Sequence, residues 1–367
     1  MKKISIILPD LRGGGAERLH IYLANHWVKL GYYVEMVLIH SDGELIPLLD
    51  KEIHVINLLC KRIRDAIFPL RRHFMKSKPD VILSAMWPLT TVTVLAWIIS
   101  NRIGRIYLID HVYLTNSCLN ELKIKLSYLA FFMNITYPMA NGIIAVSNGV
   151  KKNMLDISKL KSNSIKVIYN PAATGLNPYR GSDKLRDEIW GGRHYFNILS
   201  VGSLKTQKDH ATLIKAFSLL PTTCNAKLII LGDGELRNEL TDLILHYGLQ
   251  GRVLMPGFIL DPSNWFRTAD LFVNASRWDG LPLVLIEALE YGLPIVSTDC
   301  PHGPSEILQD GKYGTLVPVG DQAALSSAIN NAKFIIHDRD DLMLRAKDFS
   351  ISKISTEYLS YMFPNEL

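Results

Sequence analysis

Two carboxylates eight residues apart, Asp279 and Glu287, are the side chains of this sequence best suited to bind a polar ligand. They lie in SRWDGLPLVLIEALEYG, residues 276–292, where Pro282 marks the start of a helix and Gly292 its end. The residues between are apolar on most sides, so we expect the helix, and Glu287 with it, to be buried. A buried carboxylate is costly without hydrogen-bond partners, which would be either a ligand's hydroxyl groups or a buried Arg or Lys.

The start of this predicted helix is also a candidate anion site. Free backbone N–H groups and the positive end of the helix dipole attract phosphate, here around Leu281 and Leu283. At about 1.5 Å rise per residue, Glu287 would lie roughly 7–8 Å further along the axis. A ligand with its diphosphate at the helix start would then have Asp279 on one side and Glu287 on the other, both suited to sugar hydroxyls.

Two further stretches follow a predicted strand and precede a predicted helix. The first holds Gly13, Gly14 and Gly15, which allow close backbone approach to a phosphate, and the second holds Lys205 and Lys208. The alternatives are a plain turn and two exposed lysines. Gly-Gly-Gly-Ala-Glu-Arg does not fit the Gly-x-Gly-x-x-Gly fingerprint of dinucleotide-binding folds, which disfavours hydride transfer with NAD.

The elements that must position these residues follow from the hydrophobic pattern. Short β-branched runs alternate with helical patterns, which is typical of parallel sheets covered by helices. A Gly- and Pro-rich stretch at 171–194, interpreted as a linker with a short helix, divides them. We predict an α/β protein of two Rossmann-like domains that face each other across a cleft, with ligands at the carboxyl ends of the strands. The runs are 4–8, 33–39, 54–58, 81–85, 105–110, 142–147 and 165–171, then 195–203, 226–234, 252–258, 271–276, 294–299 and 314–320.

The same residues resemble a known family. A Gly-rich first loop is followed by VGSLKTQKD (201–209), LGDGELR (231–237), PGF (256–258), the acidic pair, and TDCPHGPSEIL with GTLVPVGD (298–321). In this order, over nearly the whole chain, they are similar to the retaining GT-B-fold glycosyltransferases of family 4. The resemblance implies an acceptor-binding domain at 1–171, completed by a helix returning at about 350–367. A domain that binds the nucleotide sugar would then occupy 172–349.

The resemblance also implies roles for single residues. His111, Asp279 and Gly280 would contact the transferred sugar, and Glu287 the ribose. Gly257 and Phe258 would line the base site. Lys208, with Lys205, Gly14, Gly15, Leu281 and Leu283, would bind the donor diphosphate, and His111, Asp279 and Glu287 would be the catalytic residues. The family usually has Glu where this chain has Asp279, and Arg where it has Ser203.

Charge is unevenly distributed along the chain. Residues 1–171 hold 22 basic and 12 acidic residues, whereas the whole chain has a net charge of +5. Arg71, Arg72, Lys76 and Lys78, the basic patch, lie beside Phe68, Phe74 and Met75, which predicts either a solvated helix face or attachment to an anionic membrane. No nucleic-acid-binding motif accompanies the charge.

Other features exclude further classes of protein. No apolar run reaches the roughly 18 residues of a membrane span, and the apolar run after the first lysines is too short for a signal peptide. Four scattered cysteines indicate neither a disulfide framework nor a zinc site and fit a reducing cytoplasm. Asp338 and Asp340 are interpreted as surface charge, so no metal and no cofactor is expected.

We therefore predict a glycosyltransferase that transfers a hexose or N-acetylhexosamine with retention of configuration. The expected donor is the UDP-linked sugar. The acceptor would be a glycan or a polyprenyl-diphosphate-linked glycan of bacterial surface-polysaccharide, lipopolysaccharide or glycoprotein assembly. The protein would lie in the cytoplasm, attached to the inner face of the plasma membrane. The alternatives are a sugar-nucleotide epimerase of the same fold and a non-catalytic scaffold that docks to membranes.

Overall fold

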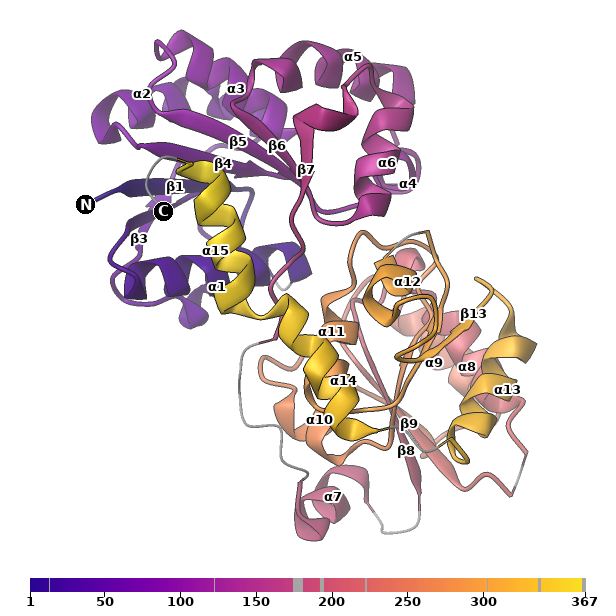
Figure 1. The fold of residues 1–367 in the computed structure, drawn as a ribbon. Coiled ribbons are helices and arrows are strands. Elements are labelled where there is room, and N and C mark those ends of the chain that lie inside the picture. The colour runs from indigo at the N-terminus through magenta and orange to yellow at the C-terminus, as the bar shows by residue number, and fades with distance from the viewer. Residues whose placement is uncertain are drawn as a thin grey trace. The chain divides into compact units, whose positions relative to one another are not determined.

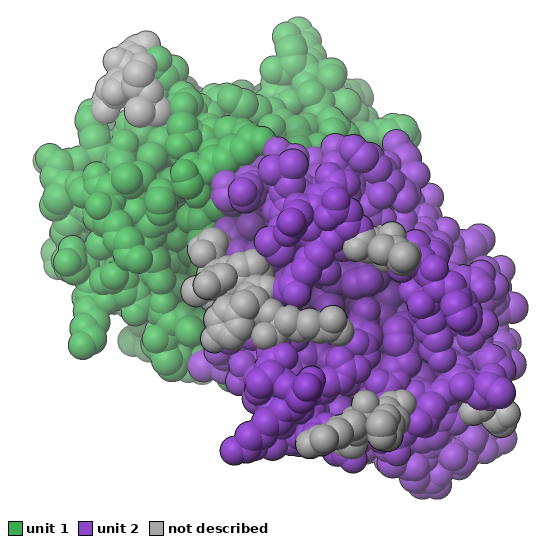
Figure 2. Space-filling view, turned by 60° about the horizontal axis from the view of Figure 1, so that its bottom comes forward, with its two compact units in different colours: residues 1–171, 351–367 green, residues 172–350 purple. Residues whose placement is uncertain are grey.

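Each of the thirteen β-branched runs of the sequence forms a strand. We describe residues 1–12, 14–121, 123–173, 181–191, 195–221, 223–301, 303–335 and 338–364 in a computed structural model of the chain. Gly13 and parts of the predicted linker, 174–180 and 192–194, lie outside the described residues. The chain divides into unit 1, residues 1–171 with 351–367, and unit 2, residues 172–350 (Figures 1 and 2).

Unit 1 contains a parallel sheet of seven strands in the order β3-β2-β1-β4-β5-β6-β7. Five of the six residues of β1 are buried, because helices cover both faces of the sheet. Figure 1 shows α1 and α15 on one face and α2, α3 and α5 on the other. The strands are β1 Lys3–Leu8, β2 Tyr33–Leu38, β3 His54–Asn57, β4 Val81–Ala85, β5 Arg105–Asp110, β6 Gly142–Ala145 and β7 Ile165–Val167. The helices are α1 Gly15–Lys29, α2 Ile67–Ser77, α3 Leu89–Ile99, α4 Leu114–Asn116, α5 Leu126–Thr136, α6 Asn148–Ile157 and α15 Ile351–Met362.

The last helix, α15, packs against α1, although some 320 residues of chain separate them. The indole N–H of Trp27 donates to Ser355 Oγ at 2.9 Å, and the ring of Trp27 meets Tyr358 edge to face. Tyr358 is fully buried. The C-terminal segment is therefore part of the core of unit 1.

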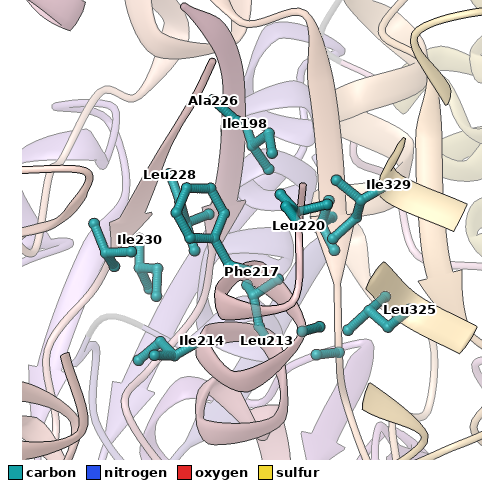
Figure 3. Close-up of a cluster of buried hydrophobic side chains, with 14 of the residues drawn as sticks. Ile198, Leu213, Ile214, Phe217, Leu220, Ala226, Leu228, Ile230, Leu325 and Ile329 are labelled. Carbon is teal, nitrogen blue, oxygen red and sulfur yellow. The ribbon is translucent and has the colours of Figure 1, made fainter. Parts of the chain in front are cut away.

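Unit 2 contains a parallel sheet of six strands in the order β10-β9-β8-β11-β12-β13. Its hydrophobic core lies between this sheet and the helices α8 and α13, with Phe217 at its centre (Figure 3). The strands are β8 Phe196–Val201, β9 Ala226–Leu231, β10 Val253–Gly257, β11 Leu271–Asn274, β12 Ile295–Thr298 and β13 Thr315–Val317. The helices are α7 Asp183–Trp190, α8 His210–Ser218, α9 Arg237–His246, α10 Ser263–Thr268, α11 Leu283–Glu290, α12 Gly303–Leu308, α13 Gln322–Ala332 and α14 Arg339–Ala346.

The strand order reverses once in each sheet. In unit 1 the chain moves outward from β1 in both directions, so β1 and β4 flank the reversal, and in unit 2 β8 and β11 do. At such a point successive crossovers run to opposite faces, which leaves a crevice at the carboxyl ends of the two strands, where ligands of open α/β sheets bind. The loops after β1, β4, β8 and β11 are therefore the first places to look for a site.

Two expectations about the whole chain can be compared with the structure. Among the described residues, no helix is long and apolar enough to span a bilayer. All four cysteines are buried and carry free thiols.

Candidate active site

The reversal point of unit 2 holds an ion pair between two of the predicted site residues. Lys208 ends a short 3-10 helix, Thr206–Lys208, that follows β8, and Asp279 lies in the loop between β11 and α11. Lys208 Nζ lies 2.5 Å from Asp279 Oδ2, and both side chains are mostly buried, 17% and 12% exposed. The sequence predicted a phosphate contact for Lys208 and a sugar contact for Asp279. The structure brings them together, with the lysine charge neutralised by the carboxylate.

Hydrogen bonds fix both loops that carry this ion pair. The Gln207 side chain donates to the carbonyl of Trp278 at 3.1 Å, and the N–H of Arg277 donates to the carbonyl of Gln207 at 2.8 Å. The Arg277 guanidinium pairs with Asp209 at 2.8 Å, and Asp209 also caps the start of α8. The positions of Lys208 and Asp279 are therefore set by contacts on either side of each residue.

Helix α11 begins one residue later than the sequence predicts, because Pro282 is its N-cap and Leu283 its first helical residue. Leu281 and Leu283 are buried, 4% and 7% exposed, so only their backbone groups are suited to a polar ligand. Gly280 donates its N–H to Asp279 Oδ1 at 3.1 Å. The predicted diphosphate contact at this helix start stays a prediction.

The prediction that Glu287 is buried is wrong. Six of the eight residues of α11 are buried, and the other two are Val284 and Glu287, which are half-buried. Residues three apart lie on the same side of a helix, so Val284 and Glu287 share its one partly open stripe. The buried acid is Glu290, 8% exposed. Glu287 can therefore reach a ligand without the cost of a fully buried charge.

The ends of β9 and β10 form the region predicted to bind the base. Gly257 ends β10 with a φ of 106°, and its carbonyl accepts a hydrogen bond from the N–H of Gly232 at 2.9 Å. Phe258 follows and is 39% exposed. Arg237 belongs to the LGDGELR segment, and the sequence predicts no role for it. Its guanidinium donates to the carbonyls of Met255 and Gly232 at 3.1 and 3.3 Å. This arginine ties the two strand ends together.

Lys205, the other basic residue of the predicted phosphate site, is exposed, and its backbone N–H donates to the carbonyl of Ser203 at 2.8 Å. Asp338 is not a metal-ligand candidate, since its carboxylate caps the start of α14 by accepting from the N–H groups of Asp340 and Asp341. Among the described residues, no three His, Cys, Asp or Glu side chains are grouped to hold a metal ion.

In unit 1, His111 directly follows β5 and is 6% exposed. Its ring interacts with the side chain of Asn170, although neither ring nitrogen makes a hydrogen bond of ordinary geometry. The ring of His20, from α1, meets it edge to face with 5.1 Å between the centroids. Burial lowers the pKa of His111 well below its ordinary value, and the nearby His20 lowers it further. His111 is therefore neutral near pH 7 and able to donate one hydrogen bond and accept another.

The glycines at the start of α1 are placed as the sequence predicts. Gly14 is the N-cap of the helix and Gly15 its first residue. A Cβ on Gly14 would lie 2.0 Å from the carboxylate of Glu17, so a side chain there would displace that carboxylate. The carboxylate of Glu17 thus fills the space above Gly14, and a ligand that approaches the backbone there has to displace it.

Sequence reasoning missed a second buried acid beside His111. Asp110, the last residue of β5, accepts a hydrogen bond from the hydroxyl of Tyr137 at 2.7 Å, and that hydroxyl contacts Thr90 Oγ1 at 3.0 Å. Burial raises the pKa of Asp110 to about 6, and its second oxygen has no hydrogen-bond partner. The Asp-His pair at a strand end was the available signal for this residue. His20, in the middle of a helix, offered none.

Models of two protein families match the chain on either side of the division between the units. The model described as Glycosyltransferase Family 4 matches residues 13–175, and that described as Glycosyl transferases group 1 matches residues 192–343. Between them they account for most of both units. The chain belongs to the GT-B glycosyltransferases of the family 4 type.

Relatives of this glycosyltransferase family member are found in archaea and bacteria. An uncharacterized glycosyltransferase of Methanocaldococcus jannaschii is 36% identical over 60% of this chain, which spans 63% of that relative. A Campylobacter jejuni relative is 27% identical over 98% of both chains. Its name is GalNAc-alpha-(1->4)-GalNAc-alpha-(1->3)-diNAcBac-PP-undecaprenol alpha-1,4-N-acetyl-D-galactosaminyltransferase.

The fold of this family member is similar to solved structures. Anabaena HepE, crystallised in complex with UDP-glucose, has a TM-score of 0.83 and 21% identity, over 98% of this chain and 100% of that one. This likeness confirms the predicted GT-B fold.

Proposed function

We propose that the protein is a retaining glycosyltransferase that moves a hexose or N-acetylhexosamine from a nucleotide sugar, with UDP as the nucleotide, to a glycan or polyprenyl-diphosphate-linked glycan. The observation that carries this proposal is the ion pair of Lys208 and Asp279 at the reversal point of unit 2, in front of α11, on which Glu287 lies about one turn from the helix start. A cation, a helix start and two carboxylates suit a diphosphate that links a nucleoside to a sugar. The UDP-glucose complex of HepE and the name of the Campylobacter relative support the choice of substrates.

The charges of the site suggest how donor binding proceeds. In the free protein the ammonium group of Lys208 is neutralised by Asp279. A bound diphosphate brings more negative charge than one carboxylate, so Lys208 would turn to the phosphate and Asp279 would become free to accept from a sugar hydroxyl. Lys208 and the first N–H groups of α11 would then stabilise the charge that develops on the leaving diphosphate. Glu287 would accept from the ribose, and Phe258 would lie beside the base.

In unit 1, neutral His111 stays the residue proposed to contact the transferred sugar, because it lies at the carboxyl end of β5 and neither ring nitrogen makes a well-formed hydrogen bond. Gly14 and Gly15 would admit phosphate or acceptor atoms close to the backbone at the start of α1. Since this scheme needs only protein cations and helix N–H groups for the diphosphate, we expect activity to persist in a chelator. Full inhibition by the chelator that Mg²⁺ or Mn²⁺ reverses would contradict that expectation.

We also propose that the protein works at the cytoplasmic face of a membrane that carries the lipid-linked acceptor. The four basic side chains predicted to bind lipid, Arg71, Arg72, Lys76 and Lys78, are all exposed on α2 or at its end. One part of that prediction is wrong. Phe74 cannot reach a membrane because it is fully buried in unit 1, whereas Phe68 and Met75 are 74% and 45% exposed.

A panel of nucleotide sugars tests the donor, because a ligand that binds only the folded state raises its melting temperature. We expect a UDP-hexose or UDP-N-acetylhexosamine to raise it most. Product analysis with a polyprenyl-diphosphate-linked glycan then tests transfer, and the anomeric configuration of the product tests retention. Conversion of the sugar without any acceptor would favour the epimerase, and donor binding without turnover the non-catalytic scaffold.

A further inference from the structure

Helix α5 has an apolar face that none of the described residues covers. Tyr128, Phe131 and Ile135 are spaced three and four residues apart and are 53%, 59% and 47% exposed. Met139, in the turn that follows the helix, is 40% exposed. We call these four residues the α5 face. The opposite side of the helix enters the core through Leu129, Met133 and Thr136.

Lysines lie at both ends of the α5 face. Lys123 and Lys125 precede the helix and are exposed. At the other end, the backbone N–H of Lys159 donates to the side chain of Asn134 at 2.6 Å, which holds the 159–161 segment against the second half of α5. Lys159 and Lys161 are both exposed. The face is therefore apolar and aromatic in its middle and positively charged at its ends.

We propose that the α5 face, with its flanking lysines, is the surface by which this protein enters the headgroup region of an anionic lipid bilayer. Aromatic and aliphatic side chains on one side of a short helix insert to the depth of the headgroups, and lysines at the rim pair with anionic lipids. This inference rests on the proposed lipid-linked acceptor and names the surface that meets the lipid.

Lipid suits this face better than a second copy of the chain does. A symmetric contact would place the same patch on both partners, so the lysines that rim one copy would approach those of the other. Anionic headgroups neutralise the same lysines. The charge around the face therefore favours a bilayer.

The α5 face is also continuous with the candidate site of unit 1. The ring of Tyr128 meets Trp87 edge to face at 6.4 Å, and Trp87 lies in the loop after β4. The backbone of Trp87 in turn lies close enough to Asp110, the residue before His111, to lower the pKa of its carboxyl. A lipid held on α5 would thus lie beside the strand ends where the acceptor is proposed to react.

The basic patch of α2 supplies charge but little apolar area. Of the apolar residues of α2, Leu70 and Phe74 belong to the core, and only Phe68 and Met75 are largely exposed. α2 packs on α3 and α3 on α5, so the two surfaces belong to one helical layer (Figure 1). We expect the basic patch to attract the membrane and the α5 face to enter it.

Co-sedimentation of the full chain with lipid vesicles tests the proposal. We expect binding to vesicles of phosphatidylcholine with phosphatidylglycerol, and little to phosphatidylcholine alone. The double variant F131S/I135S should lower partition into the anionic vesicles by about tenfold or more, since two apolar side chains no longer leave water. The variant F131W should keep binding and show quenching of the new tryptophan by brominated lipid. The matched control F334S/L344S removes two apolar side chains of unit 2 that are even more exposed, 78% and 59%, and should leave binding unchanged.

Three outcomes would overturn the proposal that the α5 face enters the bilayer. They are undiminished vesicle binding by F131S/I135S, an equal loss of binding in F334S/L344S, and a dimer of the parent chain that F131S/I135S dissociates. Binding of nucleotide sugar, measured without vesicles, separates this proposal from the proposed function. A chain that binds nucleotide sugar but not vesicles refutes the surface alone. A chain that binds vesicles through α5 but no nucleotide sugar refutes the function alone.

Discussion

At the scale of single residues, the ion pair of Lys208 and Asp279 predicts opposite changes in UDP affinity when one or the other residue is replaced. Lys208→Ala removes the cation from the phosphate site, so we expect free UDP to bind about 1.5–3 kcal/mol more weakly, the range for a hydrogen bond to a charged group. Isothermal titration calorimetry measures this directly. Unchanged affinity would show that Lys208 does not touch the diphosphate.

Asp279→Asn should act in the other direction on the same ligand. The amide keeps the shape of the side chain and no longer neutralises Lys208, so we expect UDP to bind more tightly than to the parent. Transfer should nevertheless fall, because a neutral amide oxygen is a weaker acceptor for a sugar hydroxyl than a carboxylate. Asp279→Glu, which restores the acid usual in the family, should keep turnover. Weaker UDP binding by Asp279→Asn would contradict the proposed exchange of partners.

His20 gives a prediction about pH. Burial lowers its pKa to about 4, from an ordinary value of 6.5, while its Nδ1 contacts the carbonyl of Ala16 at 2.7 Å. The unfolded chain therefore binds the extra proton between pH 6.5 and pH 4, and stability falls as the pH falls through that window. We expect His20 to cost about 2 kcal/mol at pH 5 relative to pH 7.

Replacement of His20 by Phe keeps a ring against His111 and removes the titration. Denaturant unfolding at pH 7 and pH 5 should then show a loss of stability on acidification that is smaller in His20→Phe than in the parent by about 2 kcal/mol. Each protein is compared with itself at the two pH values, so any change in the free energy of unfolding that the substitution causes equally at both pH values cancels. Equal losses of stability in the two proteins would mean that His20 is accessible to protons in the folded protein.

At the scale of elements, one buried glutamate joins two strands and a helix of unit 1. Glu35 of β2 accepts hydrogen bonds from Ser5 of β1 at 2.6 Å and from Ser77 of α2 at 2.7 Å, and it pairs with His73 of α2 at 3.3 Å. Burial alone would raise the pKa of Glu35, but these hydrogen bonds lower it to about 2. The carboxylate is therefore a stabilising contact between α2 and the sheet.

A carboxylate with a lowered pKa stabilises the fold above its ordinary pKa, near 4.5, and that stability is lost as the pH falls toward 2. Glu35→Gln should lose on the order of 3 kcal/mol at pH 7, and its stability should change less than the parent's between pH 4.5 and pH 2. Acid titration followed by circular dichroism measures both. The control Glu52→Gln, an exposed acid of the same unit, should behave like the parent.

The elements themselves could be predicted from the sequence because burial on both faces of a parallel sheet leaves a local pattern. All of the strands follow runs of β-branched residues, and α11 ends two residues before Gly292. The orientation of Glu287 within α11 could not be predicted, since a helix apolar on nearly every side does not reveal which stripe stays open. The ion pair of Lys208 and Asp279 joins residues 71 positions apart, and only the adjacency of β8 and β11 brings them together. The α5 face could not be predicted either, because sequence does not show which side of an apolar helix the core covers.

At the scale of the whole molecule, unit 1 is built from both ends of the chain, so its stability should depend on a helix that follows unit 2 in sequence. Tyr358 of α15 is fully buried against Trp27 of α1. Tyr358→Ala should destabilise unit 1 by about 3–5 kcal/mol, as large-to-small changes of aromatic core residues do. Unit 2, residues 172–350, contains its own sheet and core and should be unaffected. Hydrogen exchange followed by mass spectrometry resolves the two, and we expect faster exchange in β1, β2 and α1 with unchanged exchange in β8, β9 and α8. Ser360→Ala, an exposed change on the same helix, is the control. Equal acceleration in both units would mean that they unfold together, and the division of the chain into two compact units would then have no counterpart in stability.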